Sequence, residues 1–229
     1  MPRSATERFA TDRNAADRSP TERTRVKICG LTTVEHARVA AALGADAIGL
    51  VFYAASSRHV SLQQAVQIRA ALPAFVSVVG LFVDPSEGEV ESVLKALHLD
   101  CLQFHGGETA AFCRSFGVPY MKALRVRDDL DISSEMSKYS DSSAILLDSF
   151  DKNAAGGTGT TFDWQVARRC VQESGASIVL AGGLDASNVA EAIRLVQPYA
   201  VDVSSGVESA PGQKSTQRMQ DFFDEVYSV

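Results

Sequence analysis

Residues 26–52 read VKICGLTTVEHARVAAALGADAIGLVF, and this stretch decides the fold. A short apolar run, Val26–Cys29, is followed by a helical pattern over Thr33–Leu43 and by a second apolar run, Ala47–Phe52. Strands that are apolar along most of their length and alternate with helices are typical of a parallel sheet covered on both faces. The stretch therefore predicts one strand–helix–strand unit of such a sheet.

The pattern continues to the end of the chain. Eight strands are predicted, at Val26–Cys29, Ala47–Phe52, Val76–Val83, Cys101–His105, Tyr120–Val126, Ala144–Asp148, Ile178–Ala181 and Ala200–Val203. Helices are predicted at Thr33–Leu43, Leu62–Leu72, Glu87–Leu97, Glu108–Phe116, Asp163–Gly175, Ser187–Val196 and Thr216–Val226, with a short or irregular one in the polar stretch Asp128–Ser140. Eight strand–helix units predict an α/β protein, a (β/α)8 TIM barrel. A doubly wound open sheet is the alternative, but it usually has fewer strands and a nucleotide fingerprint after the first, which is missing here.

An internal repeat supports the barrel. A shift of 153 residues places Gly30 on Gly183 and Ala47 on Ala200, and it needs no gap across a whole strand–helix–strand unit. Use of one module twice is expected of a barrel built from repeated units.

Residues 1–24 differ from the rest of the chain. Arginines recur there every five residues, at Arg3, Arg8, Arg13, Arg18 and Arg23, and acidic residues precede four of them. A period of five matches neither a helix nor a strand, so no apolar face forms. We predict a polar, disordered tail over residues 1–24 and a single barrel domain over 25–229. A transit peptide is disfavoured because such peptides are poor in acidic residues.

The composition excludes several classes of function. The 229 residues carry a net charge of −6, so the basic excess of a nucleic-acid-binding protein is absent. No apolar run reaches about 18 residues, which argues against a membrane protein. The four cysteines are scattered without a CxxC pair, which indicates a reducing, cytoplasmic compartment and no metal site of zinc, haem or iron–sulfur type.

Two residues at strand ends are the candidate catalytic groups, because barrel enzymes place their active residues at the C-terminal ends of the strands. Cys29 ends the first strand and is followed by Gly30, which lets a ligand approach. Asp148 ends the sixth strand, where partial burial would raise the pKa of its carboxyl and suit it to proton donation. A packed cysteine and a turn-capping aspartate are the structural alternatives.

Three loops look like phosphate cradles. The first follows the sixth strand and holds Gly157 and Thr158, the second is Gly182-Gly183 after the seventh strand, and the third is Ser204-Ser205-Gly206 after the eighth. Glycine-rich turns expose backbone N–H groups to an anion, and barrels often bind phosphate after strands seven and eight. Gly157, Thr158, Gly182, Gly183, Ser205 and Gly206 are the predicted phosphate-binding residues.

Three further residues are predicted to contact a substrate. Arg58 lies in the loop after the second strand, where a guanidinium could hold a second anionic group through a bidentate fork. His105 ends the fourth strand and could orient a substrate, although a hydrogen-bonded structural histidine is the more common case. Side chains alternate along a strand, so Lys27 points inward if Cys29 does, and Asp202 on the neighbouring eighth strand is its nearest candidate partner.

These residues lie in motifs that resemble a known family. VKICGLT, QFHGGE, LLDS, GGTGTTFDW, LAGGL and VDVSSGVE occur in this order, and the resemblance to the N-(5′-phosphoribosyl)anthranilate isomerases of tryptophan biosynthesis runs from about Val26 to Phe223. The resemblance implies a (β/α)8 barrel with no metal and no organic cofactor, acting on a small phosphorylated substrate. It implies that Cys29 and Asp148 are catalytic and that Arg58 binds the anthranilate carboxylate. It leaves open whether the protein is a monomer or a homodimer.

The resemblance also implies a reaction, the Amadori rearrangement of phosphoribosylanthranilate. Asp148 would act as general acid at the furanose oxygen, and Cys29 would remove the C2 proton as a thiolate. This division predicts that the site raises the pKa of Asp148 and lowers the pKa of Cys29. The sister isomerase of histidine biosynthesis uses two aspartates, and an α-subunit-like lyase needs a Glu–Asp pair, so Cys29 disfavours both. A catalytically inactive phosphate-binding barrel that serves as a partner subunit is the alternative of a different class.

Overall fold

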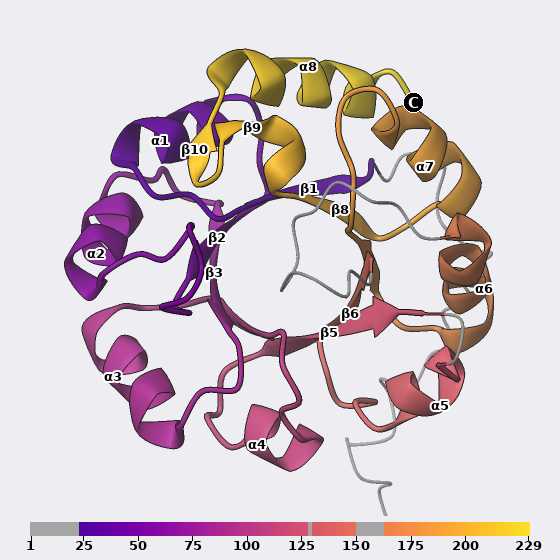
Figure 1. The fold of residues 1–229 in the computed structure, drawn as a ribbon, viewed down its shortest axis with the longest axis horizontal. Helices are drawn as coiled ribbons and strands as arrows, with labels where there is room; N and C mark the ends of the chain where they lie inside the picture. The colour runs from indigo at the N-terminus through magenta and orange to yellow at the C-terminus, as the bar shows by residue number, and fades with distance from the viewer. Residues whose placement is uncertain (1–22, 128–129, 150–162) are drawn as a thin grey trace, which may run out of the picture.

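The computed structural model describes residues 23–127, 130–149 and 163–229. Eight parallel strands form a closed barrel in the order of the chain, and helices surround it (Figure 1). The strands are β1 (Arg25–Cys29), β2 (Ala47–Val51), β3 (Ser77–Phe82), β4 (Cys101–Phe104), β5 (Tyr120–Val126), β6 (Ala144–Ser149), β7 (Ile178–Leu180) and β8 (Ala200–Val203). The helices are α1 (Val34–Ala42), α2 (Leu62–Ala70), α3 (Glu87–Ala96), α4 (Ala110–Arg114), α5 (Ile132–Ser137), α6 (Trp164–Ser174), α7 (Val189–Val196) and α8 (Thr216–Tyr227). The predicted TIM barrel is confirmed.

The barrel closes where β1 pairs with both β2 and β8. Lys27 lies opposite Ala47 on one side and opposite Asp202 on the other. Because β1 has a neighbour on each side, the sheet has no open edge, and the doubly wound alternative is wrong. The internal repeat also agrees with the bounds, since the 153-residue shift carries β1, α1 and β2 onto β7, α7 and β8.

Most helices begin directly after a residue whose side chain caps their first turn. Ser61 and Ser86 each form a capping box, with Gln64 and with Glu89, at the starts of α2 and α3. Such reciprocal bonds satisfy two of the N–H groups that the first helical turn leaves without partners. The short polar helix expected within Asp128–Ser140 is α5, which Asp131 caps.

The core has two layers. The larger lies between the strands and the helices and contains aromatic rings in contact, with Phe104 tilted against Phe82 and edge-to-face with Phe112. The smaller lies inside the barrel and consists mainly of alanine and valine side chains, including Ala123, Val179 and Ala181. The interior layer fills the barrel below its C-terminal mouth, so that the polar side chains at the strand ends lie above a packed floor.

The segment between β8 and α8 contains elements that were not predicted. After β8 the chain forms one turn of 3-10 helix, Ser205–Val207, and then a small antiparallel hairpin of β9 (Glu208–Ala210) and β10 (Gln213–Lys214) before α8. Its strands are too short and too polar to show an apolar alternation, which is the signal that identifies a strand from sequence. Figure 1 shows the hairpin on the inner side of α8, next to α1 and β1.

Candidate active site

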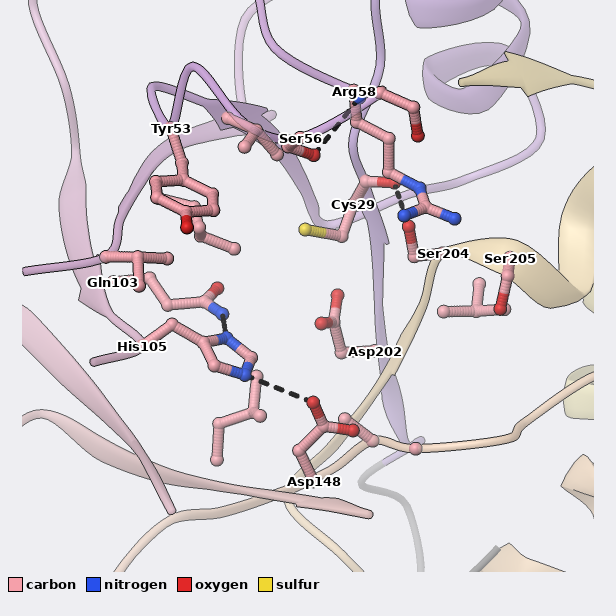
Figure 2. Close-up of a pocket in the computed structure, with 18 of the residues that line it drawn as sticks. Cys29, Tyr53, Ser56, Arg58, Gln103, His105, Asp148, Asp202, Ser204 and Ser205 are labelled. Atoms are coloured by element: carbon pink, nitrogen blue, oxygen red, sulfur yellow. Dashed lines mark hydrogen bonds and ion pairs between the residues drawn. The ribbon is translucent and has the colours of Figure 1, made fainter. Parts of the chain in front are cut away.

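A pocket opens at the C-terminal mouth of the barrel. Its wall includes the strand ends and loops that carry Cys29, Arg58, His105, Asp148 and Asp202 (Figure 2). Cys29 on β1 and Asp148 on β6 lie three steps apart around the ring, so they approach the pocket from different sides. The structure therefore brings together the predicted catalytic pair and the three predicted substrate-contacting residues.

Cys29 lies in the pocket wall with 5% of its surface exposed. Burial raises the pKa of its thiol, and the neighbouring Lys27 ammonium only partly offsets this effect. The expectation of a lowered thiol pKa is therefore wrong, because the loss of water around the sulfur raises the pKa more than the Lys27 ammonium lowers it. Gly49 makes room here, since a Cβ at this position would lie 2.8 Å from Sγ of Cys29.

Asp148 is held by two hydrogen bonds. Its Oδ1 accepts the backbone N–H of Ser149 at 2.9 Å, and its Oδ2 lies 3.1 Å from Nε2 of His105. Gly182 on the neighbouring loop has a φ of +80° and approaches so closely that a Cβ would lie 2.9 Å from Oδ1. Only glycine fits that backbone conformation and that space.

His105 links Asp148 to Gln103, which lies two residues earlier in the chain. Nε2 of Gln103 lies 3.1 Å from Nδ1 of the His105 ring, and Nε2 of the ring lies 3.1 Å from Oδ2 of Asp148, so the ring connects the amide to the carboxyl group. Oε1 of Gln103 is buried and has no hydrogen-bond partner. Figure 2 shows this Gln103–His105–Asp148 chain along one side of the pocket.

The predicted interior ion pair is confirmed. Nζ of Lys27 lies 2.8 Å from Oδ1 of Asp202, and both side chains are more than nine-tenths buried. Burial lowers the pKa of Lys27, but the Asp202 carboxylate and the Cys29 sulfur outweigh that effect and hold it above its ordinary value. Burial raises the pKa of Asp202 despite the opposing effect of Lys27. Figure 2 shows Asp202 between Cys29 and Asp148.

Arg58 reaches the mouth from the β2–α2 loop, next to Ser204 (Figure 2). Its guanidinium forms a bidentate pair with Glu208, which also accepts a hydrogen bond from Lys214. Sequence reasoning missed both partners. Glu208 is the last residue of the quoted motif VDVSSGVE, but neither alternation nor spacing links it to a loop 150 residues earlier.

The predicted phosphate cradle is partly assembled. Gly182, Gly183 and Ser205 line the pocket. Gly206 is not among the lining residues but directly follows Ser205, and a Cβ there would be 2.0 Å from the backbone oxygen of Leu184. The Gly183 carbonyl accepts a hydrogen bond from Asn188 at 2.8 Å, which sequence reasoning did not foresee. The predicted residues Gly157 and Thr158, like the predicted tail apart from residues 23–24, lie outside the described residues.

The comparisons with known proteins agree with this geometry. A sequence profile described as N-(5′-phosphoribosyl)anthranilate (PRA) isomerase matches residues 26–225. The chain belongs to the PRA isomerase family. A relative from Hahella chejuensis named N-(5′-phosphoribosyl)anthranilate isomerase is 49% identical over 206 residues, which are 90% of this chain and 95% of that protein. A relative of the same name from Azotobacter vinelandii is 52% identical over 88% of this chain and 97% of that protein.

Solved PRA isomerases share the fold. The enzyme from Thermotoga maritima superposes with a TM-score of 0.82 at 37% identity and covers 90% of this chain and 100% of its own. Another PRA isomerase structure, with a TM-score of 0.78 at 36% identity, covers the same shares and is a complex with reduced 1-(o-carboxyphenylamino)-1-deoxyribulose 5-phosphate. Among the described residues of this chain, no helix is long and apolar enough to cross a membrane.

Proposed function

We propose that the pocket at the barrel mouth rearranges N-(5′-phosphoribosyl)anthranilate to 1-(2-carboxyphenylamino)-1-deoxyribulose 5-phosphate. This activity is the PRA isomerase step of tryptophan biosynthesis, and the family to which the chain belongs is named for it. Cys29 and Asp148 line the same pocket, and this observation supports the roles assigned to them. A pair that can give a proton at one atom and take one at another is what an aldose–ketose rearrangement requires.

Asp148 is the proposed general acid. In its protonated form it gives a proton to the furanose ring oxygen while the bond between that oxygen and C1 breaks. The nitrogen lone pair forms the new C1=N bond, and the product is an open-chain iminium ion. His105 holds the carboxyl group through its bond to Oδ2, so the acid keeps a fixed direction toward the pocket.

Cys29 is the proposed general base. Its thiolate takes the proton from C2, the electron pair forms a C1=C2 bond, and the C=N pair returns to nitrogen. The resulting enolamine becomes the ketone when the C2 hydroxyl loses its proton and C1 gains one. The iminium nitrogen accepts the electrons, so the substrate supplies its own electron sink.

The remaining residues of the pocket bind the two anionic ends of the substrate. Arg58 pairs with the anthranilate carboxylate. Backbone N–H groups of Gly182, Gly183, Ser205 and Gly206 hold the phosphate, together with the loop that contains Gly157 and Thr158. His105 and Asp202, between the two ends, contact the ribose part. No observation favours the alternative of an inactive barrel.

The test is an assay with substrate made in situ from anthranilate and phosphoribosyl pyrophosphate. Addition of the protein should remove the anthranilate-type fluorescence of phosphoribosylanthranilate at a rate proportional to protein concentration. A protein that binds the reduced product but leaves the fluorescence unchanged would contradict the catalytic assignment and support the inactive barrel.

We propose a cytoplasmic protein that is a monomer or a homodimer. The four free cysteines support the first part, because reducing compartments keep thiols unpaired. For the second part, one related structure is of monomers made from the dimeric Thermotoga maritima enzyme. Sedimentation velocity of the full chain would separate the two states.

A further inference from the structure

The guanidinium of Arg58 is already held along one edge. Its Nε donates to Oε1 of Glu208 and its Nη2 donates to Oε2, each across 2.8 Å. This pair occupies the side-on edge of the planar group, and the end-on edge that includes Nη1 is the one left for a ligand. A rigid fork that is fixed along one edge presents the other edge in a single direction.

Glu208 is itself fixed. Its side chain is 4% exposed, and Nζ of Lys214, which is fully buried, donates to Oε1 across 2.8 Å. Lys214 also donates to the backbone oxygen of Ser204 at 2.9 Å, and Arg218 donates to the backbone oxygen of Glu208. A carboxylate held on both sides in this way has little freedom to rotate.

The charges of this cluster do not cancel. Burial raises the pKa of Glu208, but the hydrogen bonds and charges of Arg58 and Lys214 outweigh burial and hold the pKa below its ordinary value. Glu208 is therefore ionised at neutral pH and carries one negative charge between two cations. Because two cations face this one carboxylate, Glu208 does not cancel the attraction of Arg58 for a second carboxylate.

The hairpin that carries Glu208 also touches the loop that carries Arg58 at a second point. Gly212, at the hairpin turn, lies so close to this loop that a Cβ would be 2.4 Å from the backbone oxygen of Ser57. The carbonyl of Gly212 accepts a hydrogen bond from Thr32 at 3.0 Å, which ties the turn to the β1–α1 loop. The hairpin thus supports the β2–α2 loop both through side chains and through backbone packing.

We propose that Glu208 is a positioning residue that aims the end-on edge of Arg58 at the carboxylate of the substrate, and that it thereby makes the site selective for an aromatic amine that carries a carboxylate. This inference rests on the proposed role of Arg58. Glu208 touches no reacting atom and acts through Arg58 alone.

The experiment compares two ligands, reduced 1-(o-carboxyphenylamino)-1-deoxyribulose 5-phosphate and the phenylamino counterpart without the carboxylate. Glu208→Gln keeps the size of the side chain and removes its charge. We expect this variant to bind the carboxylated ligand about tenfold more weakly and the carboxylate-free ligand as the parent does. The KM for the substrate should rise about tenfold while kcat stays within about twofold, because the lost interaction is present in both the ground and transition states.

A double-mutant cycle tests whether Glu208 acts through Arg58. Arg58→Ala should weaken binding of the carboxylated ligand at least about 30-fold. Glu208→Gln in the Arg58→Ala background should add less than about twofold, since the residue through which it acts is gone. The matched control is Asp46→Asn, which breaks another bidentate arginine–carboxylate pair, with Arg23, far from the pocket and should leave the ligand preference unchanged.

Thermal unfolding and circular dichroism of each variant separate a folding defect from a binding defect, and the ratio of the two ligand affinities does not depend on the folded fraction. An unchanged ratio in Glu208→Gln, or a full effect of Glu208→Gln in the Arg58→Ala background, overturns the inference. If Arg58→Ala also leaves the ratio unchanged, the proposed role of Arg58 fails with it. If Arg58→Ala changes the ratio and Glu208→Gln does not, only the inference fails.

Discussion

At the scale of single residues, the thiol of Cys29 combines two opposing influences. It lies in the pocket wall, where burial favours the neutral form, and beside a buried ammonium, which favours the anion. A thiol in this position is largely protonated at neutral pH, so only its small thiolate fraction can act as a base. Its chemistry therefore depends on the surroundings of the sulfur and can be tested by replacing the sulfur alone.

Cys29→Ser should lower kcat/KM by about a thousandfold, within the range by which a general base contributes to rate. The hydroxyl is nearly the same size, but it is far too weak an acid to supply the anionic base at this pH. Cys170→Ser is the matched control, since Cys170 is a buried thiol on α6 outside the pocket. Steady-state fluorescence assays of both variants measure the effect, and near-native turnover by Cys29→Ser would remove Cys29 from the mechanism.

The raised pKa of Cys29 also fixes the sign of a pH effect. Only the thiolate reacts with iodoacetamide, so the rate at which Cys29 is alkylated should increase with pH up to the thiol pKa of the free enzyme. Because burial moves that pKa upward, the midpoint of this pH profile should lie above the ordinary thiol value of about 8.5. Mass spectrometry of the Cys29 peptide after timed alkylation measures it, and a midpoint near neutrality would show that the free enzyme already holds a thiolate.

At the scale of elements, the loops after β7 and β8 carry the proposed phosphate site. Gly183 lines the pocket with a φ of +65°, and its carbonyl is tied to Asn188. Gly183→Asp would place a side chain and a negative charge where the anion is expected to bind. We predict a rise in KM of at least about a hundredfold, since like charges in a desolvated site cost several kcal/mol. Substrate saturation curves measure it, with Gly88→Asp on the exposed surface of α3 as the control, because a Cβ there meets nothing.

The elements themselves differ in how far the sequence predicts them. The barrel strands are predictable because their apolar runs are nearly continuous, and alternation along them placed Lys27 opposite Asp202. The β9–β10 hairpin is not predictable, because two- and three-residue strands of polar residues carry no periodic signal. The pair of Arg58 with Glu208 escaped prediction for a related reason, since a loop and a hairpin share no ladder register that could bring them together.

At the scale of the whole molecule, the barrel closes between its first and last strands. The Lys27–Asp202 pair lies across this closing seam, inside the barrel and largely shielded from bulk water. An ion pair in such a place stabilises the fold less than its distance suggests, because each charge loses its hydration when it is buried. Removal of one partner, however, leaves the other charge buried without compensation.

Lys27→Met should therefore lower the free energy of unfolding by about 3–5 kcal/mol, the usual cost of breaking a buried pair. The double variant Lys27→Met/Asp202→Leu should recover most of this loss, since it replaces both charges by apolar groups that the interior tolerates. Urea unfolding followed by circular dichroism measures both variants. Asp46→Asn, which breaks a partly exposed pair with Arg23, is the control and should cost about 1 kcal/mol or less, because the solvent around the exposed pair screens it. If the double variant is as unstable as Lys27→Met, the ion pair itself stabilises the fold. The cost of leaving one buried charge unpaired would then not explain the loss.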